Sequence, residues 1–330
     1  MSAVVTVYAP GLLGPLPRQA IEALNFTTQG PLSCQLHSAK KLNSSEQGYA
    51  ATLSSLFGLT DFPFAAAARL RETGLVDNQY WSRFDPVYIQ IGATDAVLQH
   101  DDNMSLSVEE AAELVLTINE HLADFAWQVE VIHPARWYVK TSSAFHLRCP
   151  SVYELRGQSI RNAQVTGTHA SEWRRLSNEI QMLLHQHPVN AQRDLNNVTG
   201  INSIWMWGGG QLSEVPPKLR WDTVYSNDLA VQGMALYCGC QVKDISMLDV
   251  DEIGESGEVL IVDNRAYHAL QQYDLQAWYE HMQTISNYLM RLVKARHYPT
   301  LLPGREQEYR LEKLRFWQGF RCPSFAEHLT

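Results

Sequence analysis

The chain has 330 residues, of which 45% are hydrophobic and 18% are charged, an ordinary globular composition with room for one large domain or two smaller ones. Its formal net charge of −9 and its scattered basic residues argue against a nucleic-acid-binding surface, because phosphate contacts need clustered Lys and Arg. No apolar run approaches the roughly 20 residues that span a bilayer, so we expect neither nucleic acid nor a membrane as a partner.

The N-terminus and the cysteines bear on the cellular compartment. The first 16 residues are apolar but carry no Lys or Arg, and Pro10, Gly11 and Gly14 favour a strand and a turn over a signal peptide. The five cysteines include no C-x-x-C pair, so structural zinc and a disulfide framework are both disfavoured. Reduced thiols and a cytoplasmic location are therefore expected.

The first elements of the chain alternate between strand and helix patterns. AVVTVY at residues 3–8 is a β-branched run that ends at Ala9-Pro10-Gly11, which predicts a buried strand. Helical spacing follows at residues 17–24, 47–57 and 65–73, and Ser44 or Ser45 is placed to cap the second of these helices.

The middle of the chain reads as a small α+β unit. PVYIQI at residues 86–91 predicts a strand, and a helix is expected at residues 107–123 with Ser107 as its cap. Two strands, at residues 128–132 and 137–140, complete the unit. An amphipathic helix then covers residues 169–186 and ends before a proline.

The last third again alternates strands and helices. We expect a strand at residues 201–207 that is stopped by three glycines, and then a helix, a strand and a helix at residues 228–237, 259–263 and 274–294. The basic and aromatic tail at residues 309–320 either folds onto the core or presents a docking surface.

This alternation predicts an α/β fold with a mainly parallel sheet flanked by helices. The α+β unit interrupts it as an insertion. We place an α/β core at residues 1–85 and 205–330 and an inserted α+β cap region at residues 86–204.

The densest group of polar and aromatic residues lies at residues 178–210. Asn, His, Arg and Trp together suit recognition of a polar or anionic small molecule. The alternative is that these side chains cap a helix and tie a loop to the sheet. Arg193 is the best candidate to meet a phosphate or carboxylate, because its planar fork makes paired contacts. The predicted ligand-binding residues are Asn178, Glu179, His185, His187, Asn190, Arg193, Asn202, Trp207 and, from the inserted region, Arg136.

Two motifs in this stretch carry a family resemblance. H-P-V-N-x-x-R at residues 187–193 and N-x-I-W-x-W-G-G-G at residues 202–210 resemble a stretch of archaeal-type, cofactor-independent phosphoglycerate mutases, which belong to the alkaline phosphatase superfamily. The chain is more closely similar to the bacterial proteins called regulatory protein, RpfE type, whose recurrent pieces match its residues 12–15, 85–87, 107–112, 136–138 and 173–210. The resemblance spans nearly the whole chain and implies an alkaline-phosphatase-like core with an inserted cap.

The chain departs from the catalytic members of that family at their metal ligands. Where such enzymes have an Asp-Gly pair after the first strand, this sequence has Tyr8-Ala9-Pro10-Gly11, and it contains no Asp-His dipeptide. Asp263, His268 and Asp274 are weak metal candidates, but a two-metal centre needs about five to seven ligands around ions ~4 Å apart. No cofactor is therefore expected, with Mn or Zn as the alternative if other residues rebuild the site.

Three functions remain open from the sequence. The first is a degenerate, non-catalytic or regulatory protein, a pseudoenzyme that binds a small anionic ligand. The second is a phosphoglycerate mutase or related phosphoryl-transfer enzyme, for which Ser44 or Ser45 is a weak nucleophile candidate, helix capping being the simpler role. The third is metal-free acid–base chemistry by Glu179, His185 and His187. A homo-oligomer or a protein partner is possible under each.

Overall fold

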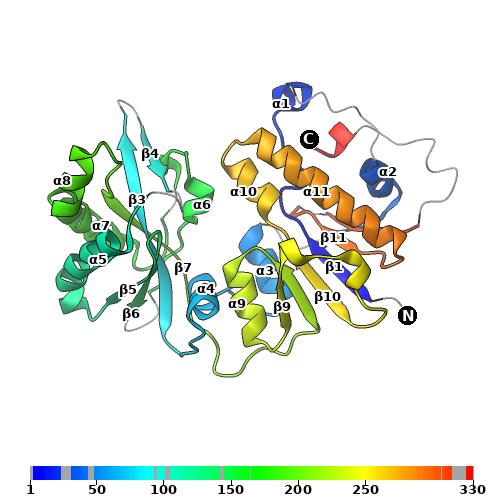
Figure 1. Ribbon diagram of the computed structural model, residues 1–330, viewed down its shortest axis with the longest axis horizontal. Coiled ribbons are helices and arrows are strands. Elements are labelled where there is room, and N and C mark those ends of the chain that lie inside the picture. The colour runs from blue at the N-terminus through cyan, green and yellow to red at the C-terminus, as the bar shows by residue number, and fades with distance from the viewer. Residues whose placement is uncertain are drawn as a thin grey trace. The chain divides into compact units, whose positions relative to one another are not determined.

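Figure 1 shows the computed structural model of the chain. It describes residues 3–23, 31–43, 48–92, 95–100, 105–141, 145–163, 165–305, 307–313 and 325–329, so the predicted nucleophile candidates Ser44 and Ser45 lie outside the described residues.

The chain divides into two compact units, and the second is inserted into the first. Unit 1 is Met1–Asp61 with Pro217–Thr330, and unit 2 is Phe62–Pro216. Unit 2 extends beyond the predicted insertion, residues 86–204, at both ends. The reason is that strands β3 (Tyr80–Ile91) and β7 (Ser203–Gly210) pair with each other along their length, so both belong to unit 2.

Unit 1 is built on a seven-stranded sheet with the order β2-β12-β11-β1-β10-β8-β9. The pairs from β11 to β9 are all parallel, and only the pairs β11–β12 and β12–β2 are antiparallel. This confirms the predicted α/β class with a mainly parallel sheet. The strands are β1 Val4–Tyr8, β2 Lys40–Asn43, β8 Thr223–Ser226, β9 Gln241–Asp244, β10 Glu258–Val262, β11 Thr300–Leu302 and β12 Gln307–Arg310.

Helices cover both faces of this sheet. The face that presents Val5, Val7 and Ile261 packs in one core cluster with α2 and α11, and Figure 1 shows α11 lying along the sheet. Tyr8 points to the opposite face, because side chains alternate along a strand, and there its ring stacks on Tyr49 at the start of α3. The helices of unit 1 are α1 Arg18–Ala23, α2 Pro31–Ser38, α3 Tyr49–Leu56, α9 Leu229–Tyr237, α10 Arg265–Gln271 and α11 Leu275–Lys294.

Unit 2 is an antiparallel sheet with the strand order β4-β3-β6-β5, to which β7 adds by pairing with β3. Phe84, Trp137 and Met206 on one face pack against α5 and α7, and Val87 and Trp205 on the other face pack near α6. The remaining strands are β4 Ala96–Gln99, β5 Gln128–His133 and β6 Arg136–Thr141. The helices are α4 Phe64–Thr73, α5 Val108–Leu122, α6 Val152–Leu155, α7 Ala170–His185 and α8 Pro188–Leu195. Short 3-10 helices in the chain lie at Ala123–Phe125, Ile160–Asn162, Ile245–Met247, Val250–Glu252 and Phe325–His328.

The prediction that three glycines end the strand at residue 207 is wrong. The glycines do not stop the predicted strand, because β7 runs through Gly210. A Cβ on Gly209 would lie 2.6 Å from the Tyr80 hydroxyl, and one on Gly210 would lie 2.6 Å from Pro63 Cα. The glycines therefore let β7 pass close to β3 and to the segment before α4.

The predicted loop after α7 is instead a second helix. A second helix, α8, begins at Pro188 with His187 as its N-cap, which suits the fixed φ of proline at a first helical position. Asn190 and Arg193 thus lie on a helix rather than in the loop that the sequence predicts.

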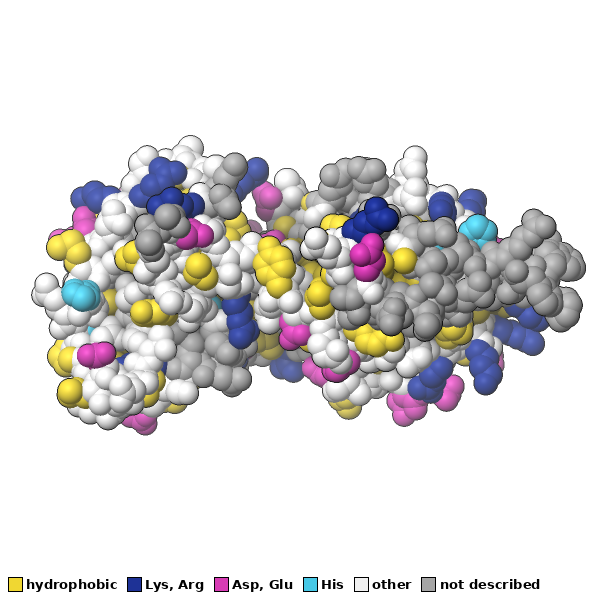
Figure 2. All heavy atoms as spheres, turned by 90° about the horizontal axis from the view of Figure 1, so that it is seen from above, with side chains coloured by type: hydrophobic (Ala, Val, Ile, Leu, Met, Phe, Trp, Pro, Cys, Tyr) yellow, Lys and Arg dark blue, Asp and Glu magenta, His cyan; other side chains and the backbone are white. Residues whose placement is uncertain are grey.

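The expectation of reduced thiols is wrong for Cys34, which is disulfide-bonded, whereas Cys149, Cys238 and Cys240 are free. Among the residues described, no helix is both long enough and apolar enough to cross a bilayer. On the face shown in Figure 2, hydrophobic side chains form small separate spots, as is ordinary for a globular surface.

Replacing Gly210 with alanine should destabilise the protein by about 1–3 kcal/mol, because the new methyl group would overlap the backbone of Pro63. Chemical denaturation measures this. Gly254→Ala is the matched control, since a Cβ there meets nothing closer than 3.8 Å. Equal stability of the two variants would contradict the packing argument.

Candidate functional site

Polar side chains follow the central parallel strands of unit 1 at the point where each strand ends. Tyr8 is the last residue of β1, Asp228 follows β8, and Asp263 and Asn264 follow β10. The three strands are neighbours in the order β1-β10-β8, so these residues meet at one edge of the sheet, where α/β proteins commonly bind ligands. We call the following residues the strand-end cluster: Tyr8, Tyr49, Asn227, Asp228, Asp263, Asn264 and Arg265.

Asp263 is a fully buried carboxylate whose charge is neutralised by Arg265. The Nε of Arg265 donates to Oδ1 at 2.8 Å, and its Nη2 donates to Oδ2 at 2.7 Å. The Asp263 side chain is 0% exposed and that of Arg265 is 28% exposed. This paired contact raises the pKa of Arg265, so the guanidinium stays charged.

Asp228 is engaged from two sides. Its Oδ1 accepts hydrogen bonds from the backbone N–H groups of Ala230 and Val231 at 2.7 and 3.2 Å and so caps α9. Its Oδ2 accepts from the Tyr49 hydroxyl at 2.7 Å and from Asn264 Nδ2 at 3.0 Å. Burial raises the pKa of Tyr49, and the Asp228 carboxylate raises it further, so the phenol remains a donor.

Tyr8 occupies the place at the end of β1. Its ring stacks on Tyr49 with the centroids 5.8 Å apart, and Tyr49 in turn stacks on Tyr267 at 5.5 Å. The buried Tyr8 hydroxyl has no hydrogen-bond partner among the described residues. Burial raises the pKa of Tyr8, and nearby Thr52, which is not in hydrogen-bond geometry, opposes this rise weakly.

The strand-end cluster does not fit a two-metal centre. Such a centre needs carboxylate oxygens that are free to coordinate, whereas guanidinium, hydroxyl and amide donors hold those of Asp263 and Asp228. Asp274 caps α11 by accepting from the backbone N–H of Ala277, and His268 lies on α10, one turn beyond Asn264. Within the described ranges, no three His, Cys, Asp or Glu residues are grouped to hold a metal ion.

Several predicted ligand-binding residues serve as internal ties in unit 2. Arg193 is 2% exposed and donates to the Thr199 and Ser105 carbonyls and to Glu110 Oε2, the last at 2.9 Å. Asn190 bridges the Leu184 and Ile201 carbonyls, and its Oδ1 accepts from the Ile201 N–H. These contacts satisfy backbone groups that the breaks between α7, α8 and β7 leave without helical or ladder partners.

Asn202 makes a similar tie, because its amide both accepts from and donates to the backbone of Ile89 at 2.7 and 2.9 Å. On α7, Asn178 and His185 are exposed, and Glu179 contacts His121 at 3.2 Å and Arg175 at 3.6 Å. Of the three residues predicted for acid–base chemistry, Glu179, His185 and His187, Glu179 is therefore paired with residues outside that group.

His187 is the predicted residue that faces an open groove. Its Nδ1 accepts from the Val189 N–H at 3.2 Å, and its Nε2 lies 3.0 Å from the Thr117 hydroxyl. Burial lowers the pKa of His187, and Glu113 opposes this. The groove has a volume of about 430 Å³ and is lined by Glu113, Leu116, Thr117, Leu183, Gln186, His187 and Pro188.

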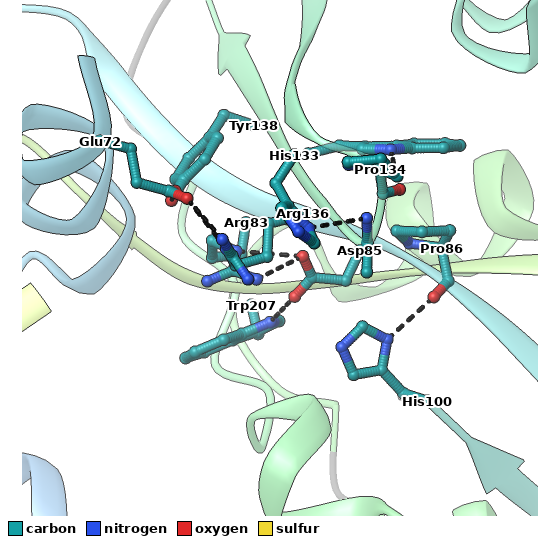
Figure 3. A network of polar contacts seen from close by, with 12 residues as sticks. Glu72, Arg83, Asp85, Pro86, His100, His133, Pro134, Arg136, Tyr138 and Trp207 are labelled. Carbon is teal, nitrogen blue, oxygen red and sulfur yellow. Dashed lines mark hydrogen bonds and ion pairs between the residues drawn. The ribbon is translucent and has the colours of Figure 1, made fainter. Parts of the chain in front are cut away.

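Trp207 and Arg136 belong to a buried polar network in unit 2 (Figure 3). The Trp207 indole N–H donates to Asp85 Oδ2 at 2.7 Å, and Arg83 donates to Asp85 Oδ1 through Nε at 3.0 Å and Nη2 at 2.7 Å. The Arg83 guanidinium also lies over the rings of Tyr138 and Trp207, 5.3 Å from each centroid. Such cation–π contacts replace part of the hydration that the buried charge has lost.

Arg136 pairs with Glu72 at 2.9 Å in the same network, and the Tyr138 hydroxyl also donates to Glu72. Arg83, Asp85 and Glu72 are not among the site residues predicted from the sequence. A signal for the first two was present, because residues two apart in a strand lie on one face and Arg83 and Asp85 flank a phenylalanine. Nothing in the sequence pattern marks Glu72, which reaches the network from the end of α4.

The sequence also missed Asp228, Asn264 and Arg265 of the strand-end cluster. Their signal was the position of polar residues directly after buried strands, at SND and DNR. Of the polar residues in that position, only Asp263 is among the metal candidates predicted from the sequence.

Comparison with protein-family models finds no match, and neither does comparison with curated proteins. Among solved structures, the chain is similar to the PH0037 protein from Pyrococcus horikoshii, with a TM-score of 0.50 and 13% identity over 91% of this chain and 81% of that one. It also aligns with a cofactor-independent phosphoglycerate mutase from Thermoplasma acidophilum, with a TM-score of 0.40 and 14% identity over 91% of this chain and 86% of that one. At these sequence identities, the similarity to the PH0037 protein concerns the fold alone. The alignment with the mutase, at a TM-score of 0.40, indicates nothing about function.

Replacing Arg265 with methionine should cost about 3 kcal/mol of unfolding free energy, because it leaves the Asp263 carboxylate buried and unpaired. Chemical denaturation near pH 7 measures the loss. The double variant Arg265→Met with Asp263→Asn should recover most of it. Arg291→Met, which breaks an exposed pair with Asp249, is the control and should change stability far less. Equal losses in both single variants would refute the account.

Replacing His187 with asparagine should make stability less sensitive to acid. Burial holds the pKa of His187 below its unfolded value of about 6.5, and its Nδ1 accepts a hydrogen bond, so the unfolded chain takes up the proton first as the pH falls. The wild type should therefore lose stability relative to the variant between about pH 8 and about pH 5.5. Asparagine keeps the helix cap, so the two should be similar at the upper pH. Parallel denaturation curves at all pH values would contradict this assignment.

Proposed function

We propose that this chain is a degenerate relative of phosphoglycerate-mutase-like proteins. It binds a small anionic molecule that carries a phosphate or a carboxylate, and it acts as a regulatory protein rather than as a catalyst. The observation that carries the proposal is the pairing of Asp263 with Arg265 at the strand ends. A fixed guanidinium there occupies the carboxylate with which a phosphoryl-transfer centre of this fold would hold a cation.

The chemistry of phosphoryl transfer explains why that pairing matters. Metal ions in such centres neutralise the oxygens of the transferred group and position the attacking oxygen. Here the carboxylate oxygens of Asp263 and Asp228 accept hydrogen bonds from protein donors. The residue at the end of β1 is the phenol Tyr8 in place of a carboxylate. A cluster of this kind supports binding by hydrogen bonds and stacking, and we propose that it works without a bound metal.

Binding without turnover fits a protein that reports the level of its ligand to another molecule. The resemblance to regulatory proteins of the RpfE type supports that role for this chain. We propose a cytoplasmic location as well, although a disulfide such as the one at Cys34 is more usual outside the cytoplasm. A homo-oligomer or a protein partner stays a prediction.

The purified protein should neither interconvert 3-phosphoglycerate and 2-phosphoglycerate in the presence of Mn²⁺ or Zn²⁺ nor retain stoichiometric metal by mass spectrometry. It should still bind 3-phosphoglycerate saturably in isothermal titration calorimetry. Two metals per chain, together with turnover that is lost on replacing Ser44 or Ser45, would overturn the non-catalytic proposal. Absence of binding to any small anion would overturn the ligand class.

A further inference from the structure

Arg305 differs from five other buried or half-buried arginines of this protein. Each of those five has a carboxylate within ion-pair distance in its own unit. Those pairs are Arg69 with Asp77 and Glu130, Arg83 with Asp85, Arg136 with Glu72, Arg193 with Glu110, and Arg265 with Asp263. Arg305 is half-buried and has no acidic partner among the described residues. Removing a cation partly from water without a counter-charge costs free energy. A bound anion would supply that negative charge.

Arg305 lies on the same edge of the sheet as the strand-end cluster. It follows β11, which is parallel to β1 and next to it, so the carboxyl ends of both strands meet there. Its Nη1 donates weakly to the His328 carbonyl at 3.4 Å. The neighbouring Gly304 lies against Pro10 and the Tyr8 ring, where a Cβ would come within 3.2 and 3.8 Å of them.

The loop after β1 runs close to the guanidinium of Arg305. Gly14 has a φ of +77°, and a Cβ built on it would sit 3.4 Å from Arg305 Nη2 and 2.9 Å from the Leu329 carbonyl oxygen. A glycine at this position thus lets the loop run close to the arginine without covering its donors with a side chain.

The charges around Arg305 favour an anion. Burial lowers the pKa of Arg305, and the nearby Tyr309 phenol opposes this. Tyr309 pairs with Lys41 across β12 and β2, and the Lys41 ammonium lies 5.8 Å from the Tyr309 ring centroid, so a second cation stands on this side of the sheet. Glu308 alternates with Tyr309 along β12 and points to the opposite face.

We propose that Arg305 is the anion-binding residue of this protein and that its guanidinium takes the phosphate or carboxylate of a small molecule at the ends of β1 and β11, with Lys41 adding to the positive field. The inference rests on the proposed function and names the residue that recognises its ligand. Guanidinium donors pair with oxyanions in a fork, and a partly desolvated guanidinium gains more from such a pair than an exposed one.

The test compares Arg305→Met with Arg310→Met, which removes an exposed arginine from the neighbouring strand β12. Inorganic phosphate, glycerate and 3-phosphoglycerate are titrated separately at constant ionic strength by calorimetry and by thermal shift. We expect at least a tenfold weaker binding of the recognised anion in Arg305→Met and wild-type binding in Arg310→Met. Without ligand, Arg305→Met should melt no lower than the wild type, because it breaks no ion pair among the described residues and only the 3.4 Å bond to the His328 carbonyl.

The probes distinguish which group is recognised: binding of phosphate alone or of glycerate alone identifies it, and either supports the inference if it depends on Arg305. Wild-type affinity in Arg305→Met would overturn the inference and leave the proposed function standing, whereas a wild type that binds none of the probes would overturn both. If Arg305→Met does not fold, Arg305→Lys decides, since it keeps the charge but not the fork. Weaker binding at an unchanged melting temperature then supports the role, and unchanged binding removes it.

Discussion

The chemistry of the strand-end edge depends on the pair between Asp263 and Arg265. A carboxylate with no exposed surface at the end of a central strand needs a counter-charge. Here the counter-charge is the guanidinium of Arg265, which lies two positions after Asp263 in the chain. Because both oxygens are held, Asp263 acts as an anchor for the start of α10 rather than as a ligand for something else. After the neighbouring strand β8, Asp228 is held in a similar way, by hydrogen bonds from Asn264 and Tyr49.

Unit 2 applies the same rule to polar residues that look functional in the sequence. The stretch at residues 178–210 is rich in Asn, His and Arg because two chain reversals in it leave backbone groups that need partners. Asn190 and Arg193 supply those partners, and Asn202 in the same stretch bonds the backbone of Ile89 on β3. A motif can therefore be specific to a family and still be structural, since a tie that satisfies buried backbone is as demanding of residue type as a ligand is.

The sequence predicted best the elements whose periodicity is long or pure. β1, α5, α7 and α11 all follow their predicted ranges closely, since each has a clear strand run or amphipathic stripe. The strands β8, β9, β11 and β12 were missed, because three or four residues carry too little pattern to stand out. In the site, Asp263 was noticed but its partner Arg265 was not, because an ion pair across a strand-to-helix turn leaves no periodic signal.

Charge decides where on this edge an anion can bind. The strand-end cluster holds two carboxylates, Asp228 and Asp263, against the single guanidinium of Arg265, so in our proposal it contacts the uncharged part of the ligand and leaves the phosphate or carboxylate to Arg305. Arg305 and Lys41 lie at the other end of the same edge, beyond β1, with no carboxylate among the described residues paired to either. Among the described residues, Arg69, Arg83, Arg136, Arg193 and Arg265 each pair with a carboxylate and Arg305 does not, so the anion that we propose would supply the missing counter-charge beside β11.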